Sequence, residues 1–321
     1  MSDQPGRTCP IRYYYGAKAI AGAPMRSAEV LYVIGGLYGN VYALRAIQAM
    51  IAEESASGAQ VIACFNGDFN WFNVSDQDFV EINQVVAQHD AIVGNVEAEL
   101  ASNDLSSGCG CAYPDEVSDI VVERSNRIFE RLHGTALKFE SIRRQFASRP
   151  MFARYKVGQS QIGIVHGDYE SLAGWRFDIG ALNKAEGDHE PLQQAFRLAG
   201  VDVFASSHTC LPVLKTFHDA TKQNKFVRAV INNGAAGMPN FSRTRYGVIT
   251  RISLKPSKKH LLYSAQLGEL HVEALQVDFD QQAWKQHFLG SWPQGSDAYE
   301  SYFERICDGP ELALPRAHET V

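Results

Sequence analysis

Four side chains that could bind a metal each stand just after a short apolar run of the sequence. Buried strands with this pattern deliver the residues at their carboxyl ends to one edge of a sheet. We therefore expect the four side chains to share one edge. They are Asp68, Asn95, His166 and His208.

This set of donors comprises two imidazoles, one carboxylate and one amide oxygen. Nitrogen donors disfavour Mg and Ca, and the lack of a clear thiolate cluster disfavours a structural zinc site. The set predicts one divalent ion per chain, of the kind of Mn, Zn or Fe(II). The alternative is that, with ten His in the chain, two follow strands by chance and bond to backbone carbonyls. The order and setting of all four donors together favour the metal.

Five blocks of the sequence resemble the motifs of the calcineurin-type metallophosphoesterases, which run D-x-H, G-D-x-x, G-N-H-[DE], H and G-H-x-H. The resemblance covers about residues 29–251, and its strength lies in the order of the blocks. The blocks read Gly36-Leu37-Tyr38, Gly67-Asp68-Phe69-Asn70, Gly94-Asn95-Val96-Glu97, His166 and Ser207-His208-Thr209-Cys210.

The resemblance implies an α/β fold, a four-layer α/β/β/α sandwich of two mixed sheets flanked by helices. The order of the expected strands and helices is compatible with it. We expect residues 1–28 to form an arm on the surface and residues 29–321 to form one domain. Within that domain, a helical insertion is expected at about 101–148.

The departures from the family motifs concern its second metal. In the family, two ions clamp the attacking and leaving oxygens of a phosphate ester. The first ion would use Asp68, Asn95, His166 and His208, with Asp68 bridging to the second, and all four are present. The remaining family ligands to the second ion are replaced by Gly36, Tyr38 and Cys210, and Val96 replaces the family's catalytic His. A standard two-metal mechanism is therefore not supported.

Three nearby residues could partly compensate for these losses. Tyr38 could give a proton or a polar contact, Cys210 could bind a metal as a thiolate, and Asp168 could orient His166. Two more thiols, Cys109 and Cys111, stand in a Gly-rich loop. The alternative is that these thiols are ordinary parts of a turn and that Cys210 packs as a small apolar residue.

Four polar residues near the motifs are candidates for holding the anionic part of a substrate. Asn40 follows the first block, Asn233 follows the last, and Arg243 and Arg245 stand in a loop rich in Asn and Gly. The alternative for this loop is an ordinary solvated turn.

The composition excludes several classes of partner. The 321 residues are 45% hydrophobic and 21% charged, with a net charge of −6. This negative net charge does not indicate binding to nucleic acid or to an anionic membrane, and no apolar run reaches the ~20 residues that span a bilayer.

The six cysteines, without a signal sequence, predict reduced thiols in a soluble, cytoplasmic protein. The sequence does not indicate the oligomeric state.

Strands after the last motif are expected at 211–217, 226–231 and 248–254, in a mainly antiparallel second sheet, with two further strands within 263–277. A terminal helix is expected at 297–307.

Two functions are compatible with these residues. The leading hypothesis is a divergent metal-dependent phosphoesterase that hydrolyses a small phosphate mono- or diester with one well-formed metal site. The alternative is a catalytically silent protein of the same fold that binds a metal, a nucleotide or a partner. A weaker option is redox or metal sensing by the thiols.

Overall fold

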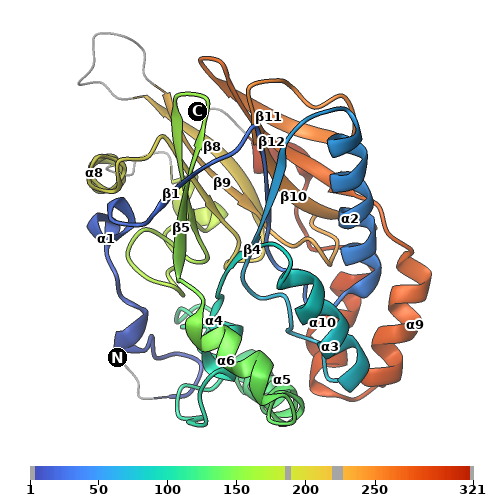
Figure 1. Ribbon diagram of the computed structural model, residues 1–321. Coiled ribbons are helices and arrows are strands. Elements are labelled where there is room, and N and C mark those ends of the chain that lie inside the picture. Colours follow the sequence, from blue (N-terminus) through green and yellow to red (C-terminus); the bar gives the residue numbers. More distant parts are fainter. Residues whose placement is uncertain (1–3, 185–188, 219–226, 319–321) are drawn as a thin grey trace.

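Two six-stranded sheets lie face to face, with helices on both outer faces (Figure 1). The computed structural model describes residues 4–184, 189–218 and 227–318. The predicted four-layer α/β/β/α sandwich is confirmed. Phe226, at the start of an expected strand, and the ends of the expected arm and domain, residues 1–3 and 319–321, lie outside the described residues.

The first sheet combines parallel and antiparallel strands. Its order is β11-β12-β10-β2-β3-β4, in which β2, β3 and β4 are parallel and β10 runs antiparallel to β2 and β12. The strands are β2 (Val30–Ile34), β3 (Val61–Asn66), β4 (Asp90–Ile92), β10 (Gly247–Ser253), β11 (Leu261–Leu267) and β12 (Leu270–Val277).

The second sheet has the order β1-β5-β6-β7-β9-β8. Within it β6, β7 and β9 are parallel, and the edge hairpin β8–β9 is antiparallel. The strands are β1 (Met25–Ser27), β5 (Phe152–Val157), β6 (Ser160–Val165), β7 (Val203–Ser206), β8 (Pro212–His218) and β9 (Val227–Asn233).

The expected grouping of the late strands into one antiparallel sheet is wrong. β8 and β9 extend the sheet that holds β7, whereas β10 crosses to the other sheet and pairs with β2. An apolar strand pattern shows that a strand is buried but does not show which strand it pairs with. The connection from β9 to β10 therefore runs between the two sheets.

Helices cover the outer face and one end of the first sheet. Buried residues of these helices share one core cluster with the outward residues Ile34, Phe65 and Ile249 of that sheet. The helices are α2 (Val41–Ala56), α3 (Asp76–Val86), α4 (Asn95–Leu100), α5 (Asp119–Ala136), α6 (Glu140–Ser148), α9 (Gln281–Ser291) and α10 (Asp297–Asp308). The segment expected as a helical insertion contributes α5 and α6, which lie across one end of the sandwich in Figure 1.

The second sheet is covered by α1 (Ala17–Ala21), α7 (Ile179–Leu182) and α8 (Glu190–Ala199), which pack on its outer face. The N-terminal segment also contains the short helix η1 (Ile11–Tyr13), whose Tyr13 is buried, and β1, which pairs with β5. Residues 4–28 are thus built into the sandwich. A second short helix, η2 (Leu314–Ala317), stands near the C-terminus. Among the described residues, no helix is long and apolar enough to cross a membrane.

The core between the sheets should dominate stability. Leu31 of β2 is fully buried in the cluster that the two sheets share. We expect Leu31→Ala to lower the free energy of unfolding by about 2–5 kcal/mol, because it leaves a cavity in a packed core. Leu198→Ala, at an exposed position on α8, should change it by about 0.5 kcal/mol or less. Urea denaturation followed by circular dichroism measures both, and equal effects would contradict this account of the core.

Candidate metal centre

The four predicted donors come together where strands of both sheets end. Asp68 follows β3, Asn95 opens α4 after β4, His166 follows β6 and His208 follows β7. Each pair of strands is parallel, so their carboxyl ends meet at one edge. All four side chains are buried, and none is more than 6% exposed.

Their inward-facing atoms form a tight group. His166 Nε2 lies 3.1 Å from Asn95 Oδ1, 3.3 Å from Asp68 Oδ2 and 3.2 Å from His208 Nδ1. One ligand atom from each of Asp68, His166 and His208 lies within 4.8 Å of those from the other two. A single cation can therefore be reached by Asp68, His166 and His208, and Asn95 Oδ1 lies beside His166 in this group.

The outward nitrogen of each imidazole faces a backbone carbonyl. His166 Nδ1 lies 2.8 Å from the Asn66 oxygen, and His208 Nε2 lies 3.1 Å from the Cys111 oxygen. A carbonyl can only accept, so both outward nitrogens donate, and the inward nitrogens His166 Nε2 and His208 Nδ1 are left with lone pairs. This is how metal-binding histidines are usually oriented.

The electrostatics of the group favour positive charge. Burial alone would lower the pKa of His166, but the Asp68 carboxylate raises it above its usual value. Burial opposes ionisation of Asp68, yet His166 lowers the pKa of that carboxyl. Burial and repulsion from His166 lower the pKa of His208 to about 3, so His208 is neutral near pH 7. Converging lone pairs that draw in a proton fit a divalent cation, which would replace that proton.

Glu97 fixes the loop that carries Asp68. Its carboxylate is fully buried and accepts hydrogen bonds from the backbone N–H groups of Asp68, Phe69, Asn70 and Gly94, and from Asn70 Nδ2. Burial and the nearby Asp68 raise the pKa of Glu97 to about 7, while the backbone donors oppose this shift. Glu97 therefore positions Asp68 without being one of the inward donors.

The loop around Asp68 is tightly confined. Asp68 has a φ of +52°, which a non-Gly residue rarely adopts. A Cβ on Gly94 would lie 2.2 Å from Asp68 Oδ1, so the close approach of these two loops requires glycine there.

The positions that the resemblance assigns to a second metal do not form a site. Gly36 has a φ of +65°, and a Cβ on it would lie 3.0 Å from the Gly234 oxygen. Tyr38 and Cys210 contact each other, with 2.7 Å between the hydroxyl oxygen and the sulfur. Burial raises the pKa of both groups, so both are protonated near pH 7 and are poor ligands.

The loop with Cys109 and Cys111 lies directly against the donors. The two sulfurs form a disulfide, so the expectation of reduced thiols is wrong for this pair, while Cys9, Cys64, Cys210 and Cys307 are free. Asn95 Nδ2 donates to the Cys109 oxygen at 2.9 Å, which turns the Asn95 oxygen inward. The thiols of the pair are not available as metal ligands.

Asp168 and the two asparagines have structural roles. The Asp168 carboxylate accepts backbone N–H groups of its own loop, at residues 170, 171 and 176, so the expected contact with His166 is wrong and the Asn66 carbonyl takes that place. Asn40 caps α2, and Asn233 Nδ2 donates to the Gly35 and Val248 oxygens between the two sheets.

Arg243 and Arg245 are exposed and do not line the cavity beside the donors. A different cation, Arg305 of α10, reaches this neighbourhood and donates to the Cys210 oxygen at 2.6 Å. The sequence offered no signal for it, because α10 is about a hundred residues beyond the last motif.

A small cavity of about 50 Å³ opens beside the donors. The cavity holds only a few waters, because one water needs roughly 10–15 Å³ by this measure. Trp71 belongs to the aromatic run after Asp68, whereas the other aromatic residues of the cavity wall come from distant segments that the sequence alone does not bring together. That wall is formed by Trp71, Tyr113, Trp175 and Tyr302.

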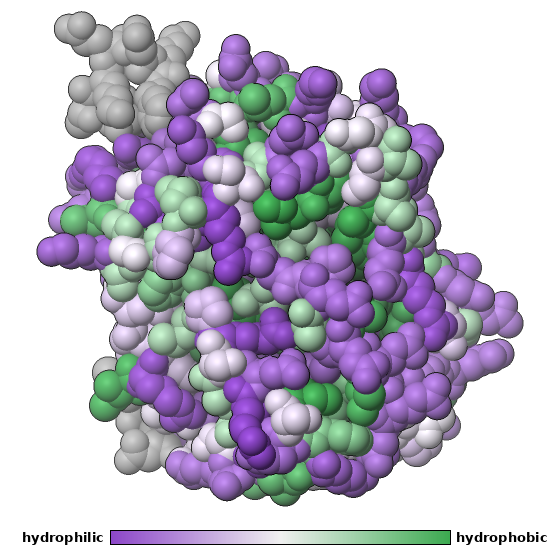
Figure 2. Space-filling view, in the orientation of Figure 1, coloured by the Kyte–Doolittle hydropathy of each residue, from purple (hydrophilic) through white to green (hydrophobic). Residues whose placement is uncertain are grey.

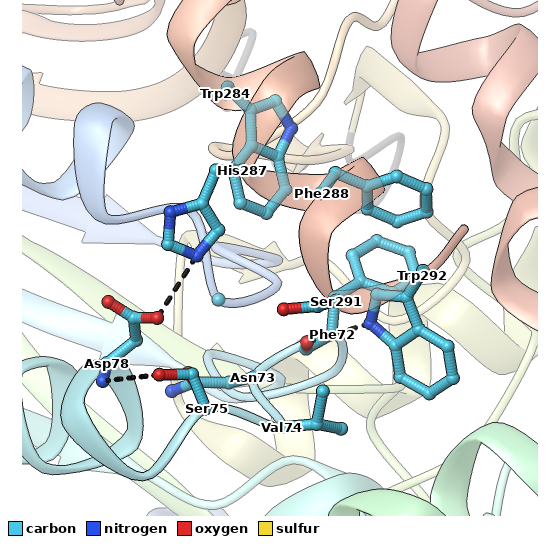
Figure 3. Close-up of a pocket in the computed structure, with 11 residues that line it drawn as sticks. Phe72, Asn73, Val74, Ser75, Asp78, Trp284, His287, Phe288, Ser291 and Trp292 are labelled. Atoms are coloured by element: carbon cyan, nitrogen blue, oxygen red, sulfur yellow. Dashed lines mark hydrogen bonds and ion pairs between the residues drawn. The ribbon is translucent and has the colours of Figure 1, made fainter.

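The C-terminal helices clamp the segment after Asp68. Figure 3 shows the junction, where Trp292 Nε1 donates to the Phe72 oxygen at 3.0 Å and His287 faces Asp78 at 3.0 Å. The crevice there has a volume of only about 10 Å³, so it is a packing defect rather than a ligand site.

Comparison with known proteins adds to this geometry. No protein-family model and no curated protein matches the chain. Among solved structures, it is similar to hypothetical protein PH1004 of Pyrococcus horikoshii OT3, with 15% identity, a TM-score of 0.57, and coverage of 88% of this chain and 99% of that one. It is also similar to a metallophosphoesterase from Sphaerobacter thermophilus, with 14% identity, a TM-score of 0.52, and coverage of 88% and 100%. The chain has the calcineurin-like metallophosphoesterase fold. At these identities the likeness concerns the fold.

The role of Glu97 can be tested by a substitution that keeps its shape. We expect Glu97→Gln to lower the free energy of unfolding by about 1–3 kcal/mol, because its amide N–H₂ must face backbone N–H donors. Glu123→Gln, at an exposed position of α5, is the matched control and should change it by about 0.5 kcal/mol or less. Urea denaturation measures both. A Glu97→Gln protein as stable as the control would show that the carboxylate does not hold this loop.

Proposed function

We propose that the protein is a metal-dependent phosphoesterase that works with one divalent ion, of the kind of Mn, Zn or Fe(II). The ion would be held by Asp68, Asn95, His166 and His208. The convergence of four buried lone-pair donors, with both imidazoles oriented by backbone carbonyls, is the observation that carries the proposal.

A bound ion of this kind polarises a phosphoryl oxygen and lowers the pKa of a bound water. The chain supplies the rest of the site. Glu97 keeps Asp68 in place, and the aromatic wall formed by Trp71, Tyr113, Trp175 and Tyr302 excludes bulk water. Tyr38 is protonated, lines the cavity and contacts Cys210, and we assign its hydroxyl the role of proton donor to a leaving group in place of the family's His.

The size of the cavity supports a small substrate. About 50 Å³ does not admit a large ester without movement of the wall. A small phosphate ester is therefore the substrate class that fits best.

A second candidate function is metal binding without catalysis. Two observations favour it: the narrow cavity, and Val96, which is buried in the core where the family places its catalytic His. Under this alternative the same four donors hold an ion, but no ester is hydrolysed.

Metal content and hydrolysis separate the two functions. We expect the purified protein to hold about one ion per chain by elemental analysis and, with added Mn, to release phosphate from small alkyl esters such as methyl phosphate, which suit the size of the cavity. His166→Ala and His208→Ala should lose the ion and lower the rate on the order of 10²-fold or more, because a metal provides several kcal/mol of transition-state stabilisation.

His271→Ala, in β12 and away from the site, is the matched control and should keep both metal and rate. One ion without hydrolysis in the unaltered protein would favour the silent alternative. Hydrolysis that persists unchanged in both His variants would contradict the assignment of activity to these donors.

The number of ions tests the role of the Tyr38–Cys210 pair. We expect Cys210→Ala and Tyr38→Phe to keep about one ion per chain, because the Tyr38 hydroxyl and the Cys210 thiol are protonated and hydrogen-bonded to each other. Tyr38→Phe should also slow hydrolysis by about 10²-fold or more if its hydroxyl gives the proton. Two ions in the unaltered protein that fall to one in Cys210→Ala would overturn the one-metal site.

A further inference from the structure

A second, much larger hollow lies at the opposite end of the sandwich. It has a volume of about 790 Å³ and is bounded by the amino end of β2, the carboxyl end of α2 and the loop between β10 and β11. Ligand pockets for small molecules are commonly about 300–1,000 Å³. In the region of α2 and β10, Figure 2 shows green apolar patches set among purple residues.

The wall of this hollow combines apolar and charged side chains. Met50, which is partly exposed, and Leu254, which is 43% exposed, supply an apolar surface above the buried Val30 and Leu275. A site for a wholly polar ion does not need such a surface, so the ligand should have an apolar body.

The loop over the hollow is held in place by buried charges. Arg251 is 3% exposed and donates to Glu273 Oε2 at 2.6 Å and to the Lys255 oxygen at 2.8 Å, while Glu273 Oε1 accepts the Ser257 N–H at 2.8 Å. Burying such a pair is costly. Here the pair fixes the backbone of the loop, so the hollow is formed before any ligand arrives.

The carboxylates that line the hollow are already engaged. Glu54 pairs with Arg251, Glu53 pairs with Lys259, and Glu29 accepts the Gln60 N–H. They therefore offer little attraction to a cationic ligand.

Two lysines of the same loop are not engaged in this way. Lys255 and Lys258 line the hollow and are exposed, and neither forms an ion pair with any residue that the structure describes. Their ammonium groups are free to bind an anion, and the rigid loop holds them next to the apolar wall.

We propose that this hollow binds a small anionic amphiphile, a molecule with a carboxylate, sulfonate or phosphate group and an apolar body. The anionic group binds Lys255 and Lys258, and the apolar body packs on Met50 and Leu254. The site is separate from the metal centre and does not rest on the proposed phosphoesterase activity.

The dye 8-anilinonaphthalene-1-sulfonate has this chemistry and serves as the probe. In a fluorescence titration of the full chain, we expect one saturable site per chain. Lys255→Glu/Lys258→Glu should weaken binding by about tenfold or more. Ala59→Trp places a large side chain in the hollow and should abolish saturable binding.

The matched control is Lys18→Glu/Lys184→Glu, which makes the same change of charge at two exposed positions elsewhere. It should bind the dye as the unaltered protein does, and so should His166→Ala. Circular dichroism checks that each variant is folded. If Ala59→Trp fails to fold, the difference in dye binding between the two double-lysine variants still tests the proposal. Equal binding by both lysine pairs, or weak binding without saturation, would overturn the proposal.

Discussion

The hydrogen bonds of the buried Glu97 carboxylate are the interactions on which the geometry of the candidate metal centre depends. The carboxylate collects N–H groups from two loops that follow neighbouring parallel strands, β3 and β4, and so joins them into one unit. A buried carboxylate is tolerable only with such a set of donors. These hydrogen bonds also hold the Asp68 backbone at its positive φ, a conformation that non-Gly residues rarely adopt.

A hydrogen bond to backbone also joins the two sheets at the candidate site. Asn66 ends β3 of the first sheet, and its carbonyl receives the ring N–H of His166 from the second. Each inward lone pair is thus set by an outward hydrogen bond to backbone, and backbone does not titrate or rotate away. The centre is a property of how two sheets are stacked, rather than of any one loop.

The resemblance of the motifs implied the four layers, and the apolar runs that end in polar residues correctly predicted that Asp68, Asn95, His166 and His208 lie together, because such runs reflect burial. The sequence did not predict sheet membership, since β10 and β9 carry similar apolar patterns yet pair in different sheets. Asp168 and Asn40 were misjudged for another reason: a polar residue beside a motif also serves as a cap or loop anchor. Arg305 could not be found at all, because only folding brings α10 to Cys210.

The left-handed turn at Gly36 has an evolutionary consequence. A chain that had merely lost an aspartate could regain it by one codon change, whereas here the regained side chain would collide with the Gly234 carbonyl and adopt an unfavourable φ. An aspartate at this position would therefore require the Gly36 turn or the neighbouring Gly234 segment to shift. The turn at Gly36 therefore disfavours an aspartate at this position.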